Sequence, residues 1–137
     1  MSVLNMYNDF RVKFPEITKK ADEEHIKYWD ELNSDFAYAW FESLAKAINQ
    51  EMNKGVDAQE YKESFEYLKT QYLFGDDKVK DCIDVSFTEN LFWKVQPSNA
   101  ENYWLLFPDV LKELYVNFGS IRVSQWDSQS FYVNAMT

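Results

Sequence analysis

The stretch "SDFAYAWFESLAKAINQEMNKG" (residues 34–55) decides the fold that we expect for this chain. Its apolar residues recur at helical spacing, and they are Ala37, Trp40, Phe41, Leu44, Ile48 and Met52. Ser34 or Asp35 can cap the start of such a helix and Gly55 can close it, because these residue types satisfy the free backbone groups at helix ends. The pattern predicts a central aromatic helix whose apolar stripe faces the core.

Apolar stripes of the same period run outward from this helix in both directions. The expected helices span about 3–14, 22–32, 35–55, 57–75, 76–94, 98–107 and 108–119, with caps at Asp57, at Asp76 or Asp77, and at Ser98 or Asn99. Gly75 can end one helix just before the next begins. The pair 57–75 and 76–93 is expected to form a tight helical hairpin, and "GDDKVKDCIDVSFTENL" resembles the second part of a HEAT-type repeat.

The composition favours one all-α domain over residues 1–137. A chain of 137 residues suits a single domain with a core of useful size. Its 3 Gly and 3 Pro argue against the many tight turns of a β-sandwich. We predict a bundle of six to seven helices, with 120–137 as an irregular or extended tail docked on it. The predicted core comprises Phe10, Trp40, Phe41, Leu44, Ile48, Phe65, Leu68, Ile83, Phe87, Leu91, Leu111 and Leu114.

The net charge of −9 limits the partners that the chain can take. Phosphates repel such a protein, so we expect no direct nucleic-acid partner and no anionic membrane partner, and the charge favours a basic partner instead. No run approaches the roughly 18 apolar residues that span a membrane, and residues 1–17 do not read as a secretory signal. Cys82 is alone, which fits a reducing compartment. We expect a cytoplasmic protein, more often monomeric than oligomeric.

Residues that carry chemistry are sparse. His25 is the single histidine, and we expect it to be a partly exposed packing residue; with Asp22 it would offer only two metal ligands. No G-x-S-x-G elbow is present, and the three glycines fall at expected helix ends rather than in a phosphate loop. Cys82 lies on the apolar side of its helix, as an inert buried thiol does. The sequence predicts no enzyme, no cofactor and no metal site.

Two acidic clusters are candidate partner-binding sites. In "GDDKVKDCIDVSFTENLFW" (75–93), Asp77, Asp81 and Asp84 can share one helix face, about 200° from the apolar stripe at 100° per residue. That face would be plain solvated surface or a landing site for a basic partner. The second cluster lies in "ADEEH" (21–25), and its members are Asp22, Glu23 and Glu24.

Aromatic residues give a second indication of a binding surface. Trp93, Tyr103, Trp104 and Trp126 gather in the last third of the chain, where the stripes are loosest. Tyr and Trp are frequent hot-spot residues of protein interfaces. Most aromatics of a small bundle must be buried, so we expect only some of this group to lie at the surface.

Taken together, the chain resembles small, acidic, all-helical immunity proteins of bacterial toxin systems, including those of contact-dependent growth inhibition. It is also similar to an uncharacterised helical family with a recurring order of short motifs. Here these read "FPEI" (14–17), "GDDKV" (75–79) and "FPDVLKELY" (107–115), so the resemblance covers most of 10–119. It implies no catalytic residue; it implies tight binding and neutralisation of a cognate toxin, often a nuclease, in the cytoplasm.

The first expectation is therefore an immunity protein that binds a basic toxin domain through an acidic and aromatic surface. A helical adaptor or regulator of another basic partner is the first alternative. A small helical enzyme that uses carboxylates and a metal is the second. Gene neighbourhood would separate them, because an immunity gene directly follows a large toxin gene.

Overall fold

The computed structural model describes the backbone of residues 1–122 and the side chains of residues 1–118. Seven α-helices, two 3₁₀ turns and one π-helix follow one another, and no strand occurs in the described part. Their bounds are α1 (Val3–Lys13), α2 (Pro15–Trp29), η1 (Ser34–Phe36), α3 (Ala37–Asn53), η2 (Ala58–Tyr61), α4 (Lys62–Phe74), α5 (Asp77–Asp81), η3 (Cys82–Thr88, the π-helix), α6 (Pro97–Leu106) and α7 (Asp109–Arg122). The predicted all-α bundle is confirmed.

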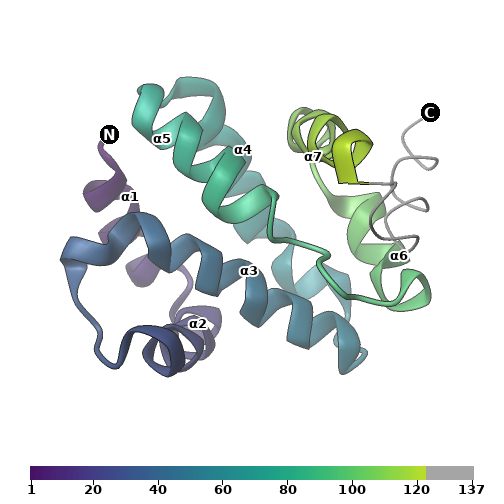
Figure 1. Ribbon diagram of the computed structural model, residues 1–137, viewed down its shortest axis with the longest axis horizontal. Coiled ribbons are helices and arrows are strands. Elements are labelled where there is room, and N and C mark those ends of the chain that lie inside the picture. The colour runs from purple at the N-terminus through teal and green to yellow at the C-terminus, as the bar shows by residue number, and fades with distance from the viewer. Residues whose placement is uncertain (123–137) are drawn as a thin grey trace.

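The central helix α3 organises the other elements (Figure 1). α1 and α2 lie toward one end of it, α6 and α7 lie toward the other, and α4 and α5 lie alongside. The most extensive packing of α3 is against α2 and against η3. Segments far apart in sequence thus meet on α3.

The core is the one that the stripes predict. Eleven of the twelve predicted core residues are buried; Leu114 is partly buried at the edge of the cluster. Aromatic rings meet edge to face in the centre, with the Phe10 ring centroid 5.8 Å from that of Trp40 and 6.2 Å from that of Phe41. Such edge-to-face contacts add to the burial of the rings themselves.

The turn between α4 and α5 forms as predicted. Gly75 follows the last residue of α4, and the Asp76 carboxylate accepts a hydrogen bond of 2.8 Å from the Val79 amide. A Cβ atom at Gly75 would lie 2.5 Å from both the Gln71 carbonyl oxygen and Val79 Cγ1, far inside normal contact. Glycine is therefore required here by the close approach of two helices.

Several predicted helix ends are wrong by a few residues. α2 begins at Pro15 rather than near 22, because proline's fixed backbone angle suits the first helical position. α6 likewise begins at Pro97, with Gln96 before it, and not after Ser98 or Asn99. The predicted cap at Ser34 or Asp35 is also wrong: the Asn33 side chain caps the 3₁₀ turn η1 by accepting from the Asp35 amide, and α3 begins after Phe36 without a side-chain cap.

The C-terminal end differs as well. The α7 backbone passes Gly119 and continues to Arg122, so the predicted stop at Gly119 is wrong. A single glycine costs a helix only about 1 kcal/mol, which leaves room for continuation. The rest of the predicted tail, residues 123–137, lies outside the described residues.

Candidate protein-binding face

A row of exposed and half-buried side chains runs along the outer side of α3. Tyr38, Glu42 and Lys46 follow one another at a spacing of four residues, which places them on one face of the helix. The Lys46 ammonium lies 4.1 Å from the centre of the Tyr28 ring, which belongs to the end of α2, and 3.7 Å from the Glu42 carboxylate. Tyr28 is 63% exposed and Tyr38 is 38% exposed. Two tyrosines thus lie at the surface along this row, one of them beneath an ammonium group.

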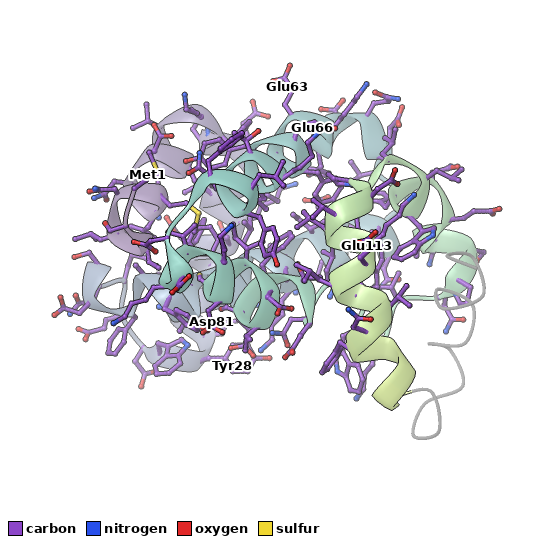
Figure 2. The ribbon with its side chains drawn as sticks, turned by 90° about the horizontal axis from the view of Figure 1, so that it is seen from above. Met1, Tyr28, Glu63, Glu66, Asp81 and Glu113 are labelled. Carbon is purple, nitrogen blue, oxygen red and sulfur yellow. The ribbon has the colours of Figure 1, made fainter. Side chains whose placement is uncertain are left out.

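The same row meets the acidic segment across a set of hydrogen bonds. The Tyr38 hydroxyl donates to the Asp81 carboxylate at 2.6 Å, and the Ser86 hydroxyl donates to the Tyr38 carbonyl at 2.7 Å. In the view of Figure 2, Tyr28 and Asp81 project toward the same side of the molecule, while Figure 1 shows that α2 and α5, the helices that carry them, lie on opposite sides of α3. We refer to Tyr28, Tyr38, Asp81, Asp84 and Val85 as the Tyr38 face.

The π-helix η3 shapes this face. It spans seven residues, which is long for a conformation that mostly occurs as single turns and often at functional sites. Its backbone bonds reach five residues on, as from the Glu89 amide to the Asp84 carbonyl at 3.1 Å. A wider helix changes the angle per residue, so the predicted common face of Asp77, Asp81 and Asp84 forms only in part. Asp77 and Asp81 are exposed, whereas Asp84 is half-buried beside the exposed Val85.

Asp84 is electrostatically unusual. Burial raises the pKa of its carboxyl, and the negative charge of Asp81 raises the pKa further. Among the described residues, no ion pair and no side-chain hydrogen bond compensates its charge. A half-buried carboxylate of this kind is stabilised when a positive charge comes close.

The second predicted acidic cluster is largely internal, because Asp22 is half-buried and Glu24 is buried. Both oxygens of Asp22 accept from the Arg11 guanidinium at 2.7 Å, and the Trp40 indole nitrogen donates to the same carboxylate at 2.8 Å. Glu24 is 6% exposed, and its carboxylate accepts from Lys27 and Gln50.

In the predicted trio, only Glu23 is exposed. The carboxylates of Asp22 and Glu24 connect α1, α2 and α3 to one another. They are therefore structural anchors rather than a free landing site.

The predicted aromatic surface is wrong for two of its four residues, Tyr103 and Trp104. Tyr103 and Trp104 are buried, and the Tyr103 hydroxyl donates to the Val56 carbonyl at 2.6 Å. The Trp104 ring packs against Phe92, Phe107 and Tyr115. Trp93 is exposed at 37%. Trp126 lies outside the described residues.

His25 and Cys82 are both buried. The prediction of a buried thiol is confirmed for Cys82, and burial raises the pKa of this thiol to about 12. The prediction of partial exposure is wrong for His25, which has no exposed surface. Its Nδ1 lies 3.3 Å from the Ser43 hydroxyl, and its ring stacks on the Trp29 ring with 5.9 Å between the two ring centres. The other ring nitrogen, Nε2, has no hydrogen-bond partner among the described residues.

No group of three or more His, Cys, Asp and Glu side chains in the described part of the chain could hold a metal ion. No helix within residues 1–122 is long and apolar enough to cross a membrane.

The fold and this face define a small all-α domain with an exposed acidic and aromatic surface beside a π-helix. The chain belongs to a family described as a domain of unknown function (DUF7674), whose model matches residues 7–122. No curated protein and no solved structure matches it.

Proposed function

We propose that this protein is a bacterial immunity protein that binds and neutralises a cognate toxin domain, foremost a nuclease, through the Tyr38 face. It acts by binding and not by catalysis, needs no cofactor, and works in the cytoplasm as a monomer. The proposal rests on the Asp84 carboxylate more than on any other observation.

Asp84 carries a charge that no described residue compensates. It is half-buried, and both burial and the negative charge of Asp81 raise its pKa. A lysine or arginine from a partner would relieve this repulsion on binding. A nuclease presents such residues, because it must hold phosphates, and a chain of net charge −9 is attracted to that surface.

The aromatic part of the face is arranged before binding. The Tyr38 hydroxyl is held by its hydrogen bond to Asp81, and the Lys46 ammonium lies over the Tyr28 ring. Side chains that are already ordered lose little entropy when they form an interface. Tyrosines of this kind supply large contact areas around a charged centre.

The test is inhibition of a toxin domain encoded directly upstream of the gene. The purified protein is mixed in increasing ratio with that domain, and nuclease activity is measured together with complex formation by size-exclusion chromatography. We expect stoichiometric loss of activity and a 1:1 complex. A stable complex with undiminished nuclease activity would favour the adaptor alternative, and full activity without a complex would refute the proposal.

A further inference from the structure

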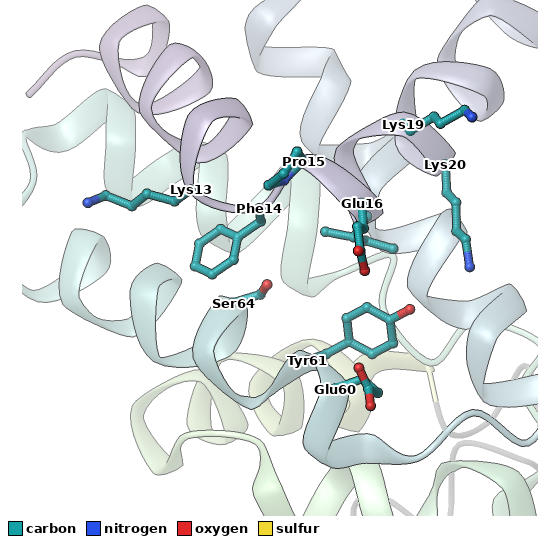
Figure 3. A pocket seen from close by; sticks show the side chains of 10 residues that line it. Lys13, Phe14, Pro15, Glu16, Lys19, Lys20, Glu60, Tyr61 and Ser64 are labelled. Atoms are coloured by element: carbon teal, nitrogen blue, oxygen red, sulfur yellow. The ribbon is translucent and has the colours of Figure 1, made fainter.

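A groove of about 540 Å³ lies between the junction of α1 and α2 and the η2–α4 segment (Figure 3). Its size falls in the range of small-molecule sites. It is lined by Lys13, Phe14, Pro15, Glu16, Ile17, Lys19, Lys20, Glu60, Tyr61 and Ser64. It shares no residue with the Tyr38 face. Along α2, Ile17 and Tyr28 are about 16 Å apart at 1.5 Å per residue.

The N-terminal end of α2 opens into this groove without a cap. Phe14 stands at the N-cap position and makes no side-chain hydrogen bond there, and Pro15 has no N–H group to donate. The Thr18 amide bonds to the Phe14 carbonyl at 3.1 Å, whereas the amides of Glu16 and Ile17 find no partner among the described residues. Amides of a first turn point back toward the helix end, where the dipole is positive, and they attract anions.

Ser64 provides a second donor from the opposite wall. It is only 2% exposed, yet its hydroxyl has no hydrogen-bond partner in the part of the chain that is described. Figure 3 shows this hydroxyl directed into the groove, toward the segment that holds Phe14 and Glu16. A hydroxyl that faces a groove can donate to water or to a ligand that replaces the water.

The charges and walls of the groove restrict the ligand. Three lysines and two glutamates line it, and the Lys13 ammonium lies 4.0 Å from the Asp9 carboxylate. The Lys20 ammonium pairs with the buried Glu51 carboxylate, and an ammonium group has three donors in all. Phe14, Ile17 and Tyr61 give the groove apolar surface.

We propose that this groove binds a small organic acid. Its carboxylate accepts from the amides of Glu16 and Ile17 and from the Ser64 hydroxyl, and its apolar body lies against Phe14 and Tyr61. The site is independent of the toxin-binding function proposed above.

Nuclear magnetic resonance titration of the whole protein with hexanoate tests the site. We expect saturable shifts of the Glu16 and Ile17 amide signals, with a dissociation constant that rises about tenfold in Ser64→Ala, because a hydrogen bond to a charged group is lost. Ser98→Ala, which removes an exposed hydroxyl on α6, is the matched control and should leave the constant unchanged. Hexylammonium and inorganic phosphate serve as comparison probes.

Each other outcome refutes the proposal. Absence of saturable shifts in the wild-type protein at tens of millimolar hexanoate would refute it without reference to any variant. Equal binding of hexylammonium would mean that Glu16 and Glu60 hold a cation instead. Equal binding of phosphate would show an anion site with no use for the apolar walls. An unchanged constant in Ser64→Ala would remove the hydroxyl from the site.

Discussion

At the scale of single residues, the Asp84 carboxyl connects stability with binding. Its pKa is raised in the folded protein, so the folded state holds the proton more tightly than the unfolded state does. Stability from this group is therefore highest at acid pH and falls as pH rises through the folded pKa. At neutral pH the charge opposes folding, while it remains available to a basic partner.

Replacing that charge should separate the two effects. In Asp84→Asn we expect an equal or slightly higher melting temperature at pH 7, together with association to the toxin domain that is about two- to fivefold slower at low salt. Glu101→Gln, which neutralises an exposed acid on α6, is the control and should change neither. Stopped-flow kinetics and calorimetry measure both quantities. An unchanged association rate would mean that Asp84 is an ordinary surface acid with no role in binding.

His25 gives a second, opposite pH dependence. Burial lowers the pKa of its imidazole, an effect that the Asp22 carboxylate partly offsets, and its ring lies among Trp29, Phe36 and the Ser43 hydroxyl. The unfolded chain takes up the proton near pH 6.5, whereas the folded chain does so only at lower pH. The unfolded state thus binds more protons in this window, and stability is lost as pH falls below about 6.5.

The His25→Gln variant tests that assignment. Its free energy of unfolding should fall less steeply than that of the wild type between pH 6.5 and pH 5, whatever its absolute stability at pH 7. Urea unfolding at closely spaced pH values gives the slopes directly. Parallel curves for the two proteins would show that His25 does not titrate in this range.

At the scale of elements, two glycines end helices for different reasons. Gly55 follows α3 with a φ of 79°, in the left-handed region, and a Cβ atom there would meet open space. Gly75 has extended backbone angles, and a Cβ atom there would collide with Gln71 and Val79. The first position needs a backbone conformation, and the second needs space.

Asparagine substitutions should distinguish these reasons. Asn tolerates the left-handed region, so Gly55→Asn should cost well under 1 kcal/mol. In Gly75→Asn, the added side chain forces α4 and α5 apart, and we expect a loss of about 1–3 kcal/mol, as for other overpacked sites. Equilibrium denaturation in urea measures both. Equal losses would mean that the α4–α5 turn adjusts freely.

At the scale of the whole molecule, α3 and its core hold the bundle together. Leu44 has no exposed surface and lies in the middle of α3. We expect Leu44→Ala to cost about 2–5 kcal/mol, because the cavity is surrounded by packed helices. Leu105→Ala, at a leucine that is 68% exposed on α6, should cost under about 0.5 kcal/mol. A loss below 1 kcal/mol at Leu44 would mean that the core relaxes around the cavity.

The sequence by itself determined the helical class, the central helix, the buried stripes and the turn at Gly75. These follow from local spacing and from residue types at helix ends, and local rules govern them. It also predicted Asp81 and Asp84 as candidate binding residues, because both fall away from an apolar stripe. Tyr38 was missed although it lies off the stripe of α3, since nothing local indicates that its hydroxyl meets Asp81, 43 residues on.

Only the tertiary structure decided which polar and aromatic residues are free. Asp22 is an anchor because Arg11 and Trp40 reach it from two other helices, and Trp104 is buried because Phe92 and Tyr115 surround it. The half-buried position of Asp84 depends on a π-helix, which the spacing of side chains does not reveal. Whether a charge is paired is a property of residues distant in sequence, and folding alone brings them together.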